Sequence, residues 1–519
     1  MIKRYACISY IVFVSVTYLV MFKSPFLDPF HTGEYFVQLI NIENSFNSFS
    51  IHGAVNYVPA FLSRIVFGDA YILPTSIFIN IIAIASSLLL AYICWLLLKG
   101  GKNRSIISLF IFSISLSFIS HRDLLLMLSI LYFIKLLHLT SFHEKINTIH
   151  LILFGLVMSL TIFWTFDRGI AGVVSIGTAY LYFLYQSKDY RLTLPIVSFI
   201  ISIIILSVTF NPTSIFHWFD NVLMLASSSS QWHYPLSLSV FLFTSLAFIF
   251  FLFTVLNTLK QTKIENSYIF KTHLIFVFLL SLFLFRSAID RADISHILLT
   301  LIGVFLIISL ILGRESKIYY PFVGARFDFI VVLFICSVLV VGLKFKNLGI
   351  IYSSFLFAFV FMAEHEGQNR DLKRYIAISS LAFFALISLF NAYKKYNEMS
   401  FNKVASSGVT WAAQTLSAHN EKCIFDLTNN GIINALSDLP TCTKYSYPVY
   451  APYKDEYLLL KQLKENMPNF IVYSSSFWSY AIDGKSMAIR YPNVDTFIKA
   501  NYTFSECKFD YCIKSRINF

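Results

Sequence analysis

Long apolar runs dominate the pattern of hydrophobic and polar positions. About thirteen of them are long enough, at roughly 16 to 25 residues, to cross a bilayer as helices. They lie at approximately 5–22, 71–98, 106–120, 124–140, 149–165, 170–186, 192–210, 235–256, 272–285, 297–312, 328–343, 348–363 and 375–391. The pattern therefore predicts an α-helical polytopic membrane protein with about 11 to 13 transmembrane helices.

Composition supports this class. Of the 519 residues, 57% are hydrophobic and 13% are charged, whereas soluble domains carry about 25% charged residues. A soluble enzyme is excluded. Lys3 and Arg4 precede the first apolar run, and no small-residue cleavage site follows it, so we expect an uncleaved first helix.

The positions of the cations predict the orientation. Cytoplasmic loops of membrane proteins are enriched in Lys and Arg. With the N-terminus inside, the loops after even-numbered runs are basic, through Lys99, Lys102, Arg104, Lys188, Arg191, Lys260, Lys263, Lys271, Arg314, Lys317, Arg326, Arg370, Lys373 and Arg374. An odd number of helices then places residues 396–519 outside, which in a bacterial inner membrane is the periplasm.

Residues 396–519 form a polar tail after the transmembrane domain, 1–395. Alternating patterns predict a strand at 423–429, a helix at 455–466, a strand at 469–474, a helix at 494–500 and a hairpin at 504–513. We therefore expect a small α/β domain of roughly 110 residues.

The cysteines of the tail support an oxidising compartment. Its four cysteines are Cys423, Cys442, Cys507 and Cys512, and disulfides persist outside the cytosol. Four cysteines permit three connectivities. We favour Cys423 with Cys442 and Cys507 with Cys512 over the alternative, a zinc site, because the cysteine spacing is wrong for a zinc knuckle.

The first external segment, 23–70, is too long for a simple connection. Residues 33–42 within it are amphipathic, with Tyr35, Phe36, Leu39 and Ile40 apolar and Glu34, Gln38 and Asn41 polar. We expect a helix that lies along the membrane surface.

The sharpest candidate for chemistry is Asp28-Pro-Phe-His-Thr-Gly-Glu34 in that segment. If a helix begins near Pro29, His31 and Glu34 share a face and Asp28 precedes the helix start. Two carboxylates and an imidazole then converge at the outer surface. The alternative is that Asp28 only caps the helix and Glu34 is solvated.

Further polar clusters recur at the same predicted level. They are His121-Arg122-Asp123, Asp167-Arg168, and Arg286, Asp290, Arg291, Asp293 and His296, and the aromatic loop 211–236 joins them. Arg residues beside acids either neutralise one another or form a cationic pocket for a phosphate. Lys135 and His138, by contrast, are expected to snorkel at the cytoplasmic end.

Several other site classes find no support. Glu364-His365-Glu366 resembles a metal-ligand cluster but falls on the predicted cytoplasmic side, where a solvated loop is favoured. The chain has no Walker A loop, no Gly-rich dinucleotide fingerprint and no His-Glu-x-x-His. We expect membrane lipid as a partner and no nucleic acid.

The first-loop acids, the amphipathic helix and the external tail together resemble the polytopic glycosyltransferases of the C superfamily (GT-C), especially bacterial serotype-converting O-antigen glucosyltransferases. The resemblance implies transfer of a sugar, expected to be glucose, from a polyprenyl-phosphate donor to a cell-surface glycan acceptor. Asp28, Glu34 and His31 would be catalytic. The donor phosphate would contact Arg122, Arg168, Arg291 and His296, with Asp167 and Asp293 in support.

Three further possibilities stay open. Asp28 and Glu34 could ligate Mg²⁺ or Mn²⁺, although such cations usually require more oxygen ligands. An O-antigen polymerase or ligase is the first alternative function, and a polysaccharide transporter or flippase is the second.

Overall fold

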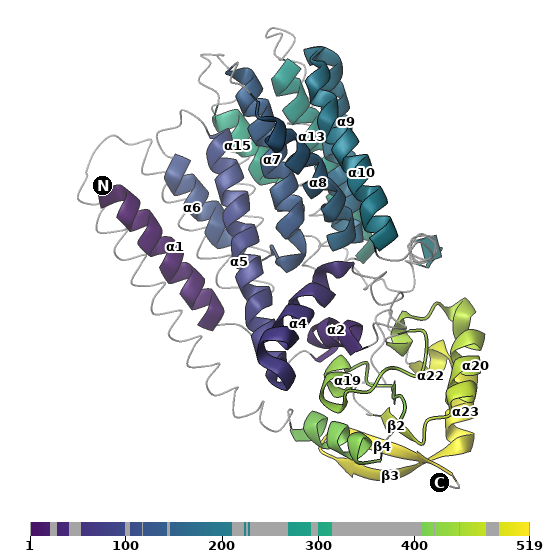
Figure 1. Cartoon of the computed structure of the whole chain (residues 1–519). Helices are drawn as coiled ribbons and strands as arrows, with labels where there is room; N and C mark the ends of the chain where they lie inside the picture. The colour runs from purple at the N-terminus through teal and green to yellow at the C-terminus, as the bar shows by residue number, and fades with distance from the viewer. Residues whose placement is uncertain are drawn as a thin grey trace.

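The computed structural model of the chain (Figure 1) describes residues 2–20, 29–40, 53–98, 104–116, 118–142, 146–209, 223–224, 227–228, 268–291, 299–313, 407–419, 421–445, 447–473 and 487–517. The predicted runs at 235–256, 328–343, 348–363 and 375–391 lie outside these residues.

A bundle of apolar helices forms the larger part of the described structure. Its members are α1 (Ile2–Val20), α5 (Ile72–Leu97), α6 (Arg104–Ser115), α7 (Leu124–Ser141), α8 (Thr148–Trp164), α9 (Phe166–Ser187), α10 (Leu194–Thr209), α13 (Tyr268–Arg291) and α15 (Leu301–Leu312). Every predicted run within the described residues is therefore helical. In length and composition, Ile72–Leu97, His121–Ser141 and Tyr268–Ala288 suffice to cross a membrane, and Thr148–Trp164 and Tyr190–Leu206 are shorter apolar helices.

The bundle interior is packed with large apolar side chains. Phe133, Phe154, Phe183 and Phe276 are all fully buried in one cluster. Helices that are apolar on all sides bury one face against their neighbours and leave the other to lipid. This explains why α10 keeps Ile204 and Ile205 each 57% exposed.

Two helices cross the end of the bundle beside the tail domain (Figure 1): α2 (Pro29–Ile40) and α4 (Ala54–Phe67). A helix is present at the predicted place as α2, and it begins with Pro29 at the first helical position, where proline is favoured. Its apolar face does not lie along a membrane surface as expected, because Phe36 and Leu39 are buried in a core shared with the tail. Its polar face is not solvated, because Glu34 is 4% and Gln38 3% exposed. The interpretation of Glu34 as a solvated residue is therefore wrong. The helix α4 was not predicted.

The tail is a small α/β unit. It contains a helix at 407–418, β1 (Phe425–Asp426), α19 (Gly431–Ser437), η6 (Pro448–Tyr450), η7 (Tyr453–Asp455), α20 (Glu456–Asn466), β2 (Phe470–Tyr473), α22 (Met487–Arg490), α23 (Pro492–Asn501), β3 (Tyr502–Lys508) and β4 (Tyr511–Arg516). The sheet order is β1-β2-β4-β3. β1 runs parallel to β2, with Phe425 opposite Ile471, and the other two pairings are antiparallel.

The first strand of the tail is shorter than the predicted 423–429 because its own acid ends it. The Asp426 carboxylate accepts hydrogen bonds from the backbone N–H groups of Thr428 and Asn430, both at 2.7 Å. Asn429 then adopts a left-handed conformation, with φ 53°. The chain turns here and leads into α19, which the sequence pattern did not show.

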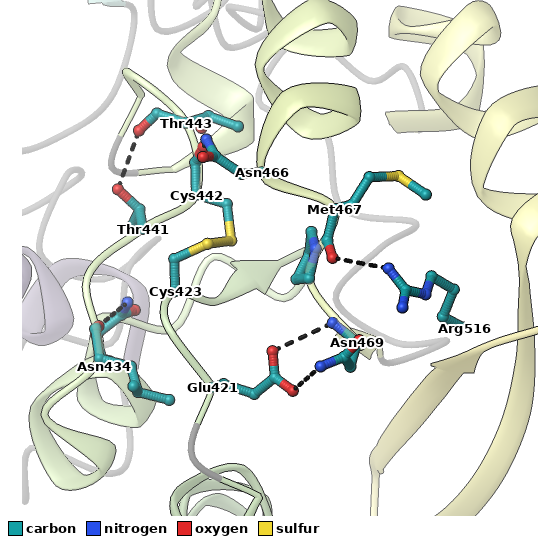
Figure 2. Close-up of a disulfide and its surroundings, with 12 residues drawn as sticks. Glu421, Cys423, Asn434, Thr441, Cys442, Thr443, Asn466, Met467, Asn469 and Arg516 are labelled. Atoms are coloured by element: carbon teal, nitrogen blue, oxygen red, sulfur yellow. Dashed lines mark hydrogen bonds between the residues drawn. A yellow bond between two sulfur atoms is a disulfide. The ribbon is translucent and has the colours of Figure 1, made fainter. Parts of the chain in front are cut away.

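Figure 2 shows the first of the two disulfides. The structure joins Cys423 to Cys442 and Cys507 to Cys512, the same pairs that the sequence favoured. Close by, Glu421 accepts two hydrogen bonds from Asn469, from the backbone N–H at 3.1 Å and the side-chain amide at 2.9 Å. These bonds tie the segment before β1 to the start of β2.

The tail domain and the bundle share a hydrophobic core. Phe36 of α2 and Ile72 of α5 lie in one buried cluster with Ile432 of α19 and Phe470 of β2. Burial of apolar side chains from both parts stabilises their association, so the tail is packed onto the end of the bundle. The helix α1 begins at the opposite end (Figure 1).

Candidate active site

A short 3-10 turn, η3 (His121–Asp123), joins the end of α6 to α7 and carries one of the predicted clusters. Ser120 caps it: its hydroxyl accepts the Arg122 backbone N–H at 3.2 Å, and the Asp123 carboxylate accepts the Ser120 N–H at 2.8 Å. This reciprocal cap gives hydrogen-bond acceptors to backbone N–H groups that have no partner within the helix itself. It also fixes the backbone from which His121 and Arg122 project.

A buried ion pair joins this turn to the start of α9. Nη1 of Arg168 lies 2.6 Å from Oδ1 of Asp123, and the same nitrogen donates to the Ser120 hydroxyl at 3.0 Å. The side chains are 7% and 0% exposed. Asp167, predicted as a supporting residue, is 48% exposed and only within 4.0 Å of Arg168. Of the carboxylates in the described part of the chain, the closest to Arg168 therefore comes from the other cluster.

A second ion pair brings the first-loop motif to the same place. Nη2 of Arg122 lies 3.4 Å from Oε2 of Glu34, and these side chains are 21% and 5% exposed. Arg122 is the more accessible of the two site arginines, while Glu34 is held on the inner side of α2. An acid and a cation predicted from separate motifs thus meet at one end of the bundle.

Sequence reasoning missed Asn56, which is fully buried on α4. Its Oδ1 lies 3.4 Å from Nε2 of His121, and the indole N–H of Trp164 donates to the His121 carbonyl at 3.1 Å. The ring of Tyr35 meets that of His121 edge-on at 5.3 Å. An amide inside an otherwise apolar stretch was the available signal, because buried polar groups need partners.

The remaining predicted site residues are not placed in this cluster. Asp28, Asp293 and His296 lie outside the described residues, as do Glu364-His365-Glu366 and nearly all of the aromatic loop 211–236. Arg291 ends α13, but its side chain is not described.

His31 and Glu34 lie on the same helix in different surroundings. His31 is exposed and its ring lies 5.0 Å from that of Phe30, whereas Glu34 is buried. The helix begins at Pro29 as predicted, so His31 and Glu34 are three residues apart on one helix. The two side chains nevertheless lie in different environments, because only Glu34 is buried. Glu34 contacts Arg122 at the end of the bundle, while His31 lies at the surface of the same helix.

The described residues do not fit a metal centre. Among them, no group of three or more His, Cys, Asp or Glu side chains is placed to hold a metal ion. The four tail cysteines form disulfides, which contradicts the zinc alternative. A role for Mg²⁺ or Mn²⁺ at Asp28 and Glu34 stays a prediction.

The described cluster contains two cations and two carboxylates in close contact. Arg168 is matched by the fully buried Asp123 at 2.6 Å, whereas Arg122 meets Glu34 at a longer distance and keeps part of its surface accessible. A buried, paired guanidinium is a fixed part of the structure. An accessible one can also bind an oxyanion.

A bundle of apolar helices, with short helices across one end and a small α/β domain beside them, defines the class of protein. The chain shares this architecture with a protein of known structure.

Within that class, a solved structure with this fold is ArnT from Cupriavidus metallidurans in the apo state. The TM-score is 0.52 at 12% identity, over 100% of this chain and 99% of that one. The structure of the same protein bound to undecaprenyl phosphate gives a TM-score of 0.48 at 12% identity, over 98% of each chain. No family model and no curated protein matches the sequence.

Proposed function

We propose that the protein is a membrane glycosyltransferase that moves a sugar from a polyprenyl-phosphate donor to a cell-surface glycan. The observation that carries the proposal is the contact between Glu34 and Arg122, beside the buried Arg168–Asp123 pair, in a chain that shares the fold of ArnT. A carboxylate and an accessible guanidinium at the end of an apolar bundle suit a substrate with a lipid tail and a phosphate head.

The chemistry needs a base and a cation. Glu34 or Asp28 accepts the proton of an acceptor hydroxyl as its oxygen attacks the anomeric carbon of the donor sugar. The bond from that carbon to the phosphate oxygen breaks, and the electron pair leaves with the polyprenyl phosphate. Arg122 stabilises the negative charge that develops on the departing phosphate. A direct displacement of this kind inverts the anomeric configuration, which NMR of the product linkage tests.

The position of Arg168 gives it a different role from that of Arg122. Its guanidinium is held by Asp123 and Ser120 and is almost fully buried. It supports η3, from which Arg122 projects, and adds positive potential to the site. We therefore assign direct phosphate contact to Arg122 before Arg168, and retain Arg291 and His296 as further candidates.

The side of the membrane on which the reaction takes place limits the kind of sugar donor. Nucleotide sugars are confined to the cytoplasm, so a reaction at the outer face requires a donor linked to lipid. Two disulfides in the tail favour an oxidising compartment. We propose that the N-terminus is cytoplasmic and that the tail lies in the periplasm, where it helps to hold the acceptor. Glucose and O-antigen are the proposed sugar and acceptor.

Expression of the gene in a bacterium with a known O-antigen structure and the donor lipid tests this function. The wild type is expected to add a sugar to the polysaccharide, and Glu34→Gln is expected to abolish the addition. Glu465→Gln is the matched control, because Glu465 is 58% exposed on α20 and its contact with Lys461 is long, at 3.8 Å. Unchanged polysaccharide in the wild-type strain would reject the proposal.

A further inference from the structure

The backbones of α2 and α19 touch at two glycines. A Cβ atom on Gly33 would lie 2.5 Å from the Gly431 nitrogen, and one on Gly431 would lie 2.3 Å from the Gly33 carbonyl oxygen. Neither residue is among the described glycines with positive φ. The absence of a side chain is thus required by the close approach of two helices and not by backbone conformation. This contact joins the site helix to the tail domain.

One tyrosine hydroxyl spans the same contact. Tyr447, which is 1% exposed, donates to the Phe30 carbonyl at 2.9 Å and accepts the Gly431 N–H at 3.1 Å. In an α-helix the carbonyl of residue 30 faces the amide of residue 34. Tyr447 therefore binds the turn of α2 that carries Glu34.

Other side chains of α2 meet the bundle. Glu34 contacts Arg122, and the rings of Tyr35 and Phe36 meet those of His121 and Tyr71 at 5.3 and 5.6 Å. Because α2 lies between the two parts, a shift of the tail moves the helix against the bundle. The 3.4 Å distance between Glu34 and Arg122 leaves little room for such a shift before the contact is lost.

We infer that the tail domain positions the catalytic carboxylate, and that Tyr447 and Gly431 are the positioning residues that hold Glu34 against Arg122. The inference rests on the proposed function and adds a role for the tail in the chemical step. Removing the Tyr447 hydroxyl deletes the bond to Phe30. Adding a methyl group at Gly431 forces α19 away from α2.

Two matched controls separate positioning from general damage. Tyr502→Phe removes a buried hydroxyl that donates to the Pro468 carbonyl at 2.8 Å, entirely within the tail. Gly177→Ala adds a methyl group on α9, where a Cβ atom meets nothing within 4 Å. Both controls change the same atoms as the test variants without touching α2.

The experiment measures amide hydrogen exchange and sugar transfer in the purified full-length protein, with polyprenyl-phosphate glucose as the donor. Tyr447→Phe and Gly431→Ala are expected to speed exchange in residues 29–40. They are also expected to lower kcat by about tenfold, with KM for the donor changed by less than about twofold, because misplacement affects the chemical step more than binding. Tyr502→Phe and Gly177→Ala are expected to change neither the exchange in residues 29–40 nor kcat.

The possible failures are distinct. If the wild type transfers sugar and Tyr447→Phe has the same kcat as Tyr502→Phe, the positioning role is overturned and the proposed function stands. If the wild type transfers no sugar, the proposed function falls and the positioning role falls with it. Tyr447→Phe decides the question on its own if Gly431→Ala does not fold.

Discussion

The guanidinium of Arg168 at the start of α9 lies 2.6 Å from the carboxylate of Asp123 at the start of α7, and both side chains are almost completely removed from solvent. The pair connects α7 and α9 of the bundle next to the site. Its hydrogen bond to Ser120 extends the connection to the cap of η3. Arg122, one of the two residues between Ser120 and Asp123, is thereby held in place against Glu34.

Breaking this pair is expected to destabilise the protein strongly. Asp123→Asn leaves the Arg168 charge buried without its carboxylate, which costs about 3 to 5 kcal/mol. The thermal midpoint of the detergent-solubilised protein measures the loss. Asp167→Asn is the control, because Asp167 is 48% exposed and 4.0 Å from Arg168. Equal midpoints for the two variants would contradict the assignment of Asp123 as the main partner.

Replacing Glu34 of the first-loop motif is expected to lower the rate of sugar transfer strongly. Glu34→Gln keeps the size of the side chain but removes the proton acceptor, so the transfer rate should fall by about 10²- to 10⁴-fold. Arg122→Lys retains the charge and is expected to lose less activity than Arg122→Ala. Rates are measured with the purified protein and a polyprenyl-phosphate sugar. A rate for Glu34→Gln near that of the wild type would leave Asp28 as the candidate base.

The two disulfides are expected to differ in their contribution to stability. Cys423 and Cys442 are separated by 19 residues and Cys507 and Cys512 by 5. In the chain-entropy account a longer closed loop gives more stabilisation, about 3 against about 2 kcal/mol here. The double variants Cys423→Ser with Cys442→Ser and Cys507→Ser with Cys512→Ser are compared by thermal midpoint. A larger loss from the second pair would contradict the prediction.

The tail cysteines also report sidedness. If the tail is periplasmic, a membrane-impermeant reductant followed by an impermeant maleimide should label them in intact spheroplasts. The variant in which all four are replaced by Ser should lose this label, while Cys94, which is buried in the bundle, stays unlabelled in both. Labelling that requires lysis of the spheroplasts would place the tail inside.

Asp426 is expected to make the stability of the tail depend on pH. Burial raises its pKa from 3.8 to about 6, although three hydrogen bonds from Thr428 and Asn430 act in the opposite direction. Because the folded-state pKa is the higher one, the folded state binds the extra proton between these values. The free energy of unfolding should therefore rise as pH falls through that window, by about 1 to 3 kcal/mol from this group.

The measurement for Asp426 compares the wild type with Asp426→Asn, which does not titrate. Thermal midpoints of the full-length protein are recorded from about pH 7 to about pH 4, and the difference between the two curves isolates Asp426 from other carboxylates. The wild type should gain stability relative to the variant as the pH falls. A difference that is constant with pH would show that Asp426 has an ordinary pKa.

The elements of the tail that have a clear periodic pattern of apolar residues were predicted from the sequence, and those without one were missed. The helix at 455–466 and the strand at 469–474 correspond to α20 and β2, because a run with one period and clear ends specifies its own structure. The helix α19 was missed, since its seven residues are too few to show a period. No element was predicted for 407–418, so the helix there was missed as well.

Only part of the candidate site could be predicted from the sequence. The first-loop motif and the clusters around Arg122 and Arg168 were found because ionisable residues at the ends of apolar runs stand out. Their pairing was not, because Asp167 is the neighbour of Arg168 in sequence while Asp123 is its closest partner in space. Asn56 lacked a charge and was overlooked.

The sequence by itself determined that the chain is a helical membrane protein with a cysteine-bearing tail, because hydropathy, cation positions and cysteine number are properties of composition and local order. Only the tertiary structure decided which acid meets which arginine and how the tail reaches the site. Those contacts depend on the close approach of Gly33 to Gly431 and on the burial of Glu34 between two parts of the protein. Neither is encoded in any single stretch of the chain, since each arises where segments distant in sequence pack together.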